Sequence, residues 1–116
     1  MKKSASPGVP TPRKDRPNVL PLEGVIDLHV SPTVTASLNR MVEKKPKNLV
    51  VDLSRVTYID SAGLAALIEA MQKVEAYGGK FALAGLQETV RSIFEISRLD
   101  QVFQIFPDVD AALARA

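Results

Sequence analysis

The chain has 116 residues, of which 46% are hydrophobic and 24% charged, and its formal net charge at pH 7 is +2. This length and balance indicate one globular domain with a modest core. The chain has no cysteine, which excludes disulfides, thiolate metal sites and a cysteine nucleophile. No apolar run approaches the roughly 18 residues of a membrane-spanning helix, so we expect a cytoplasmic protein with no membrane partner.

The N-terminal segment differs in composition from the rest of the chain. Residues 1–17 hold four of the eight prolines and only one acid. Their basic residues are Lys2, Lys3, Arg13, Lys14 and Arg16. We predict a disordered Pro-rich basic leader over 1–17 and a folded domain over 18–116. Because no aromatic residues are interleaved with these cations, we expect no nucleic-acid partner.

The first expected elements are a strand and a helix. The strand covers 19–22 and continues over 25–28 after an interruption at Gly24, and Pro21 predicts an edge position or a bulge because proline cannot donate to a ladder. Ser31 followed by Pro32 predicts a helix with Ser31 as its N-cap. Two lysines and a proline at 44–46 predict where that helix ends.

The rest of the chain continues this alternation of strands and helices. A strand over 48–53 is apolar enough to be buried on both faces, and we expect residues 54–60 to connect it to the next helix, with Val56, Tyr58 and Ile59 in the core. The further expected elements are a helix over 61–77 ended by Gly78-Gly79, a strand over 80–84, a helix over 88–97, a strand over 102–106 and a short helix capped by Asp108. Together they predict an α/β fold with a sheet of about four mostly parallel strands and about four helices packed on it.

Ser61 is the hydroxyl best placed for chemistry, because it lies where a strand passes into a helix N-terminus. Two interpretations are open: Ser61 caps the helix, or it accepts a phosphate that the helix dipole favours. Catalysis is disfavoured, since His29 is the only histidine and the Gly-x-Ser-x-Gly elbow is absent. Asp60 and Asp27 have no second ligand at suitable spacing, so we expect no catalytic residues, no metal and no cofactor.

Five segments of the chain resemble the STAS domain family, in particular the stand-alone bacterial anti-sigma factor antagonists. The match covers about residues 19–115, and the Asp-Ser-x-Gly-Leu pattern at 60–64 is its most specific part. The segments are Gly24-Val25-Ile26-Asp27, Val51-Asp52-Leu53-Ser54, Tyr58 to Leu64, Gly78-Gly79-Lys80 and Ile93 to Leu99. The resemblance implies a STAS-type fold and a partner-switching function without enzymatic activity.

In that mechanism the unphosphorylated antagonist binds an anti-sigma factor that is also a serine kinase, and the sigma factor is released. The kinase then phosphorylates the serine of the motif, here Ser61, and a PP2C-type phosphatase reverses the modification. Relatives often have a second serine where this chain has Ala62, so Ser61 is the sole candidate within the motif. The implied partner-binding residues are Asp27, Asp60, Ser61, Ala62 and Gly63.

Two alternatives remain at this point. Asp27 could simply hydrogen-bond the loop ahead of Ser31. The domain could also be a non-phosphorylated structural STAS subunit of a lipid-transport ATPase complex or of a stress-sensing scaffold, although such relatives often lack the serine.

Relatives usually have a further strand before residues 19–27, where this chain has only the Pro-rich stretch. One sheet edge is therefore less protected, and we expect a monomer with at most weak dimerisation.

Overall fold

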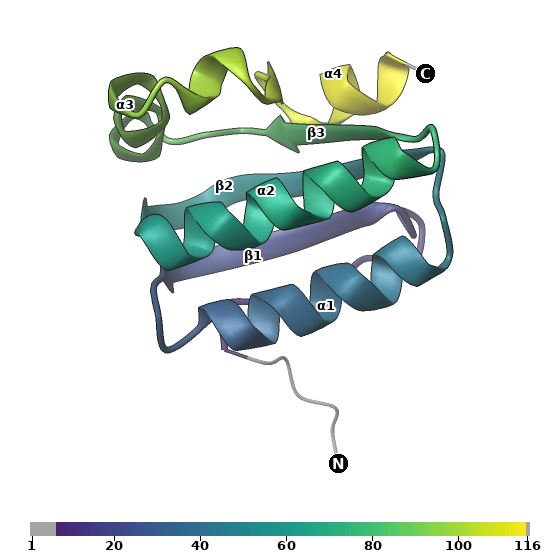
Figure 1. The fold of residues 1–116 in the computed structure, drawn as a ribbon, viewed down its shortest axis with the longest axis horizontal. Coiled ribbons are helices and arrows are strands. Elements are labelled where there is room, and N and C mark those ends of the chain that lie inside the picture. The colour runs from purple at the N-terminus through teal and green to yellow at the C-terminus, as the bar shows by residue number, and fades with distance from the viewer. Residues whose placement is uncertain (1–6, 116) are drawn as a thin grey trace.

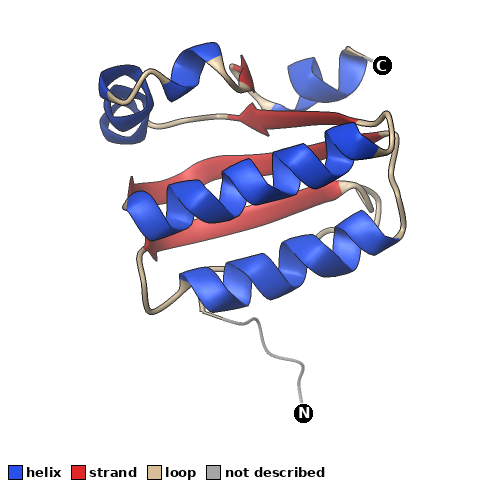
Figure 2. Ribbon diagram, viewed as in Figure 1, coloured by secondary structure: helices blue, strands red, loops and turns tan. Residues whose placement is uncertain are grey.

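Four parallel strands form one sheet in the order β1-β2-β3-β4, as Figures 1 and 2 show. The structure is a computed structural model, and it describes residues 7–115. The strands are β1 (Val19–Ile26), β2 (Asn48–Ile59), β3 (Lys80–Ala84) and β4 (Gln104–Phe106). The helices are α1 (Ser31–Glu43), α2 (Ser61–Ala76), α3 (Glu88–Ile96) and α4 (Val109–Ala114), with a 3-10 turn at Leu99–Gln101. The α/β fold with a parallel sheet is therefore confirmed.

Helices cover both faces of the sheet, but not equally. α1 and α2 lie side by side along β1 and β2 (Figure 1) and enclose the larger apolar core. The smaller helix α4 packs on a second cluster formed by Val19, Val50, Ala82 and Ala84. In β2, Leu49 and Val51 belong to the larger core and Val50 to the smaller one, as the alternation of side chains along a strand requires. None of the helices within residues 7–115 is long and apolar enough to cross a membrane.

β2 is longer than the sequence analysis predicted. Residues 54–59, expected as a connection, continue the strand and pair with β1 as far as the partners Ile26 and Ile59. Val56 and Ile59 are buried as expected, but Tyr58 is 49% exposed, so its predicted place in the core is wrong. The connection between β2 and α2 is reduced to Asp60 alone.

β1 lies at the edge of the sheet, as Pro21 predicted, and it is also irregular. Its register with β2 shifts between Pro21 and Glu23 and again between Gly24 and Val25. Gly24 has a φ of +76°, which glycine adopts without steric cost, so the strand passes through this position without ending. The strand stops at Ile26, and residues 27 and 28, expected as strand, form a turn.

The segment ahead of β1 packs on the domain from residue 8 onward, although the boundary was predicted at residue 18. The side chain of Val9 is only 6% exposed and joins the larger core. The carbonyl of Gly8 accepts a hydrogen bond from the Glu23 amide at 2.9 Å, and the Arg16 guanidinium pairs with Asp110 of α4 at 2.5 Å. Part of the predicted leader therefore has fixed contacts, whereas Lys2 and Lys3 lie outside the described residues.

The start of α1 also differs from the prediction. Val30 is the N-cap residue and Ser31 is the first residue of the helix, so the predicted capping role of Ser31 is wrong. The acceptor for the first amides is Asp27 instead, because its backbone carbonyl accepts from the amides of Val30 and Ser31 at 3.0 and 2.8 Å. The ends of α1 and α2 agree with the prediction, since α1 stops before Lys44 and α2 before Gly78, whose φ is +86°.

Candidate functional site: the start of α2

Asp60 joins the end of β2 to the start of α2 and caps the helix. One oxygen of its carboxylate, Oδ1, accepts hydrogen bonds from the amides of Ala62 at 2.9 Å and Gly63 at 3.1 Å. Its own backbone carbonyl accepts from the amide of Leu64 at 2.9 Å. Three amides of the first turn are thus satisfied by a single residue. The capping role considered for Ser61 belongs to Asp60.

Ser61 is the first residue of α2 and is exposed. Within residues 7–115 its hydroxyl group makes no hydrogen bond, and the first turn is capped by Asp60 instead. The neighbouring Ala62 is half-buried and has no hydroxyl. The first turn of α2 therefore exposes one hydroxyl, that of Ser61.

Gly63 allows α2 to approach the ends of β1 and β2 closely. A Cβ atom at this position would lie 2.6 Å from Cγ1 of Ile59 and 2.9 Å from Cγ2 of Ile26, distances that side chains do not tolerate. The amide of Asp60 also donates to the carbonyl of Ile26 at 3.1 Å. The turn that contains Ser61 is therefore fixed against the ends of both strands.

Asp27 lies at the matching position after β1. Ile26 and Ile59 are partners in the sheet, and each is followed directly by an aspartate, Asp27 or Asp60. One carboxylate oxygen of Asp27 accepts from the amides of His29 at 3.0 Å and Val30 at 3.2 Å. The alternative that Asp27 hydrogen-bonds the loop ahead of α1 is confirmed. Both aspartates thus organise turns at the carboxyl end of the sheet.

Three exposed apolar side chains near these turns were not predicted as site residues. Val25 and Tyr58 are partners across β1 and β2 and are 47% and 49% exposed, and Leu28 in the turn after β1 is 69% exposed. The sequence signal was present, because Val25 and Tyr58 directly precede the buried Ile26 and Ile59, and alternation along a strand places them on the opposite face. For Tyr58 this signal was missed because residues 54–60 were expected to be a connection.

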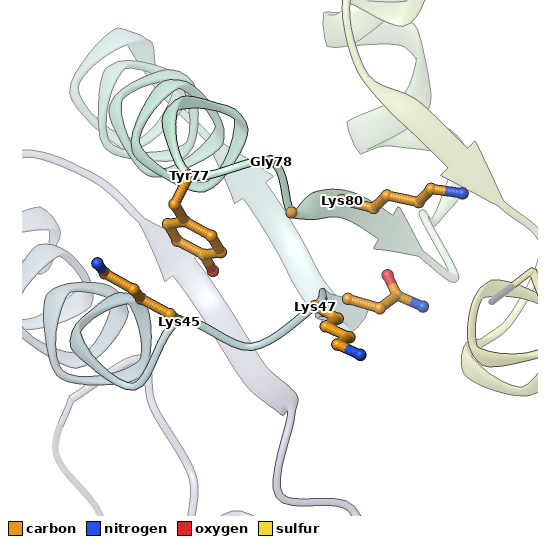
Figure 3. A pocket seen from close by; sticks show the side chains of 7 residues that line it. Lys45, Lys47, Tyr77, Gly78 and Lys80 are labelled. Atoms are coloured by element: carbon orange, nitrogen blue, oxygen red, sulfur yellow. The ribbon is translucent and has the colours of Figure 1, made fainter.

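A groove of about 650 Å³ opens at the other end of the molecule, at the amino ends of β2 and β3. Its lining includes Lys45, Lys47 and Lys80, whose ammonium groups point away from one another in Figure 3. The Tyr77 hydroxyl donates to the carbonyl of Pro46 at 2.8 Å, and burial raises the pKa of Tyr77 above its usual value. In residues 7–115 no cluster of three or more His, Cys, Asp or Glu side chains could hold a metal ion. The groove contains none of the residues predicted for the site.

Comparisons with known protein sequences all point to one family. Residues 9–112 match the family model of the STAS domain. The chain is 30% identical over 95 residues to the anti-sigma-F factor antagonist RsfB of Mycobacterium tuberculosis, covering 82% of this chain and 77% of that protein. It is 30% identical over 82 residues to the anti-sigma-B factor antagonist of Listeria monocytogenes, covering 71% and 72%.

Solved structures lead to the same family. An anti-sigma factor antagonist from Mycobacterium paratuberculosis superimposes with a TM-score of 0.82 at 28% identity, covering 97% of each chain. The parallel sheet, the aspartate-capped α2 and the Asp-Ser-x-Gly-Leu turn thus occur in a chain whose sequence and fold both match one family. The chain belongs to the STAS domain family.

Proposed function

We propose that this chain is a cytoplasmic anti-sigma factor antagonist that acts by binding and has no turnover of its own. In its unphosphorylated form it binds an anti-sigma factor that is also a serine kinase, and the sigma factor is released. Phosphorylation of Ser61 ends this binding, and a PP2C-type phosphatase restores it. The names of the relatives at 30% identity support the general function, and the geometry of the α2 start supports the role of Ser61.

The observation that carries the proposal is the division of roles between Asp60 and Ser61. Asp60 completes the cap of α2, so Ser61 is not needed to stabilise the helix. The Ser61 hydroxyl is exposed and has no hydrogen bond within the described residues. A hydroxyl in this position suits a kinase substrate, because it can be modified without unfolding the turn that presents it.

A phosphate on Ser61 would change the charge of the surface more than its shape. The amides of Ala62, Gly63 and Leu64 already donate to Asp60, so they are not free to neutralise the new group. The modification adds about two negative charges beside the Asp60 carboxylate. A partner that packs on the turn then meets two unfavourable effects, the desolvation of the anion and electrostatic repulsion. Both favour dissociation.

The apolar side chains beside the turn support a docking role for the same end of the molecule. Val25, Leu28 and Tyr58 are large and exposed, and they lie at the carboxyl ends of β1 and β2 or in the turn after β1. Apolar and aromatic side chains of this kind supply contact area at protein interfaces. We assign them, with Asp27, Asp60, Ser61, Ala62 and Gly63, to the surface that contacts the kinase.

The proposal is tested by incubating the full chain with candidate anti-sigma factor kinases and ATP, followed by intact-mass measurement and site mapping. We expect one phosphate, located on Ser61. Ser61→Ala should accept no phosphate and should therefore always remain able to bind the kinase. Ser61→Asp should bind the kinase poorly because of its negative charge. Binding is measured by calorimetry with the same kinase.

Ser54→Ala is the matched control, because Ser54 is also exposed and lies on β2 outside the motif. It should be phosphorylated like the parent chain. If Ser61→Ala still takes up a stoichiometric phosphate, the assignment of the site is wrong. If no kinase modifies the parent chain, the non-phosphorylated structural STAS subunit becomes the better interpretation.

A further inference from the structure

The segment that precedes β1 lies against the turn between β1 and α1. Gly8 has a left-handed φ of +78°, and a Cβ atom there would lie 2.4 Å from Cγ1 of Val30. Since no side chain tolerates such a distance, only glycine allows this contact. Val30 is the last residue of the turn and the N-cap of α1. The Gly8 backbone is therefore pressed against the side chain that closes the turn.

The same turn is held from within by Asp27. The amides of His29 and Val30 both donate to its Oδ1 atom, at 3.0 and 3.2 Å. Leu28 and His29 form the exposed tip of the turn. The Asp27 carboxylate fixes the backbone of the turn, and Gly8 fixes the side chain of Val30. Together they determine where Leu28 is presented.

Gly8 and the Ser61 turn share one neighbour, Ile26. A Cβ atom at Gly8 would lie 3.3 Å from Cδ1 of Ile26, and a Cβ atom at Gly63 would lie 2.9 Å from its Cγ2. A single isoleucine side chain thus separates the N-terminal segment from the first turn of α2. Val9, which is buried in the same core, anchors the segment in this place.

We propose that Gly8 and Val9 are positioning residues for partner recognition. They hold the 27–31 turn in one place beside Ser61, so that the partner meets Leu28 and the Ser61 hydroxyl as one preformed surface. This inference rests on the proposed function for the identity of the partner, the anti-sigma factor kinase. It locates part of the recognition machinery ahead of β1, in a segment that carries no residue of the Asp-Ser-x-Gly-Leu motif.

The test compares Gly8→Ala with Gly24→Ala in the full chain. Gly24 has nearly the same φ, +76°, but a Cβ atom there meets no heavy atom within 4 Å. The two variants therefore share the backbone strain and differ in the contacts with Val30 and Ile26. The first measurement needs no partner: it is the hydrogen-exchange rate of the His29 and Val30 amides, which should rise in Gly8→Ala and stay near the parent value in Gly24→Ala.

The second measurement is the kinetics of Ser61 phosphorylation by the kinase that modifies the parent chain. Gly8→Ala should raise KM about fivefold and leave kcat unchanged, because the turn is displaced while the acceptor hydroxyl is intact. Adding Val30→Ala to Gly8→Ala makes room for the new methyl group and should lower KM part of the way back to the parent value. If Gly8→Ala does not fold, Val30→Ala alone removes the same contact from the other side and should also raise KM.

Three outcomes would overturn the inference. They are unchanged exchange and KM in Gly8→Ala, equal changes in Gly8→Ala and Gly24→Ala, and a lowered kcat at constant KM. Failure of the proposed function is distinguishable from these results. If no kinase modifies Ser61, the exchange rates of His29 and Val30 still report whether Gly8 holds the turn.

Discussion

At the scale of single residues, two neighbours at the start of α2 have separate tasks. Asp60 is half-buried and satisfies three amides of the first turn, whereas Ser61 is exposed and satisfies none in the described structure. This separation matters because a residue that both caps a helix and accepts a phosphate would alter the helix when modified. In this chain the Ser61 hydroxyl, the proposed modification site, can be modified without removing the cap of the helix.

Replacing Asp60 with Ala should lower the free energy of unfolding by about 1 kcal/mol, since the amides of Ala62 and Gly63 lose their acceptor. Denaturation by urea measures this change. The same variant should also raise the KM of Ser61 phosphorylation, because the turn loses its fixed geometry.

Asp108→Ala is the matched control for this cap. Asp108 caps α4 by accepting from the amide of Ala111 at 2.8 Å, in a helix that does not carry Ser61. It should lose stability without a change in KM. Equal phosphorylation kinetics in the two variants would contradict the role of Asp60 at the site.

At the scale of elements, the sequence predicted the order and type of every strand and α-helix. It missed the full length of β2 and began the last strand at residue 102, whereas β4 begins at Gln104 because Val102 ends the 3-10 turn. A strand is recognised in a sequence because buried and exposed residues alternate along it with a period of two. This alternation breaks where the register of β1 and β2 shifts. The residues of β2 that belong to the larger core change from a spacing of two at Leu49, Val51 and Leu53 to a spacing of three at Val56 and Ile59. The change coincides with the register shifts between β1 and β2, and it obscures the period of two that would have extended the predicted strand to Ile59.

The candidate site was predicted more completely than the surface around it. Asp27, Asp60, Ser61, Ala62 and Gly63 all lie at the carboxyl ends of β1 and β2 or in the first turn of α2. Motif residues can be read locally because they serve one turn. The contact of Gly8 with Val30 joins positions far apart in the sequence, and the composition of residues 1–17 favoured disorder. Tertiary packing outweighed that local tendency.

The C-terminal end of α1 gives a prediction at this scale. Lys45 follows the C-cap residue of α1 and has a φ of +51°, a conformation that costs a non-glycine residue about 1 kcal/mol. Lys45→Gly should therefore raise the free energy of unfolding by somewhat less than that amount, because glycine also gains entropy in the unfolded chain. Thermal or urea denaturation measures the gain.

Arg98→Gly provides the comparison, since Arg98 has a φ of +65° and lies between α3 and the 3-10 turn. A similar gain in the free energy of unfolding for Arg98→Gly would show that the effect comes from the backbone conformation. A loss of stability in Lys45→Gly would instead mean that the lysine side chain contributes contacts that outweigh the strain. Neither position lies in the first turn of α2.

At the scale of the whole molecule, the parallel sheet gives the protein two different ends. The carboxyl ends of β1 and β2 meet the N-termini of α1 and α2 and carry the candidate site (Figure 1), in agreement with the general location of sites in α/β folds. The amino ends of β2 and β3 carry the lysine-lined groove. The segment from Gly8 to Arg16 reaches from one end toward the other, because Gly8 contacts Val30 and Arg16 pairs with Asp110.

The edges of the sheet predict the oligomeric state. β4 is only three residues long, and the β1 edge is partly covered where Gly8 accepts from the Glu23 amide. Short or covered edges do not template further strands, so we expect a monomer. Sedimentation velocity over a range of concentrations measures the mass, and a mass of two chains at the lowest concentration would contradict the expectation.

The lysine-lined groove has a consequence for the charge of the modified protein. The chain carries a net charge of +2, and a phosphate on Ser61 adds about two negative charges, so the sum falls close to zero. The lysines of the groove stay at the opposite end, where the phosphate cannot neutralise them locally. If Ser61 is phosphorylated as proposed, the protein changes from weakly basic to nearly neutral, and the added negative charge and the lysines of the groove lie at opposite ends of the strands.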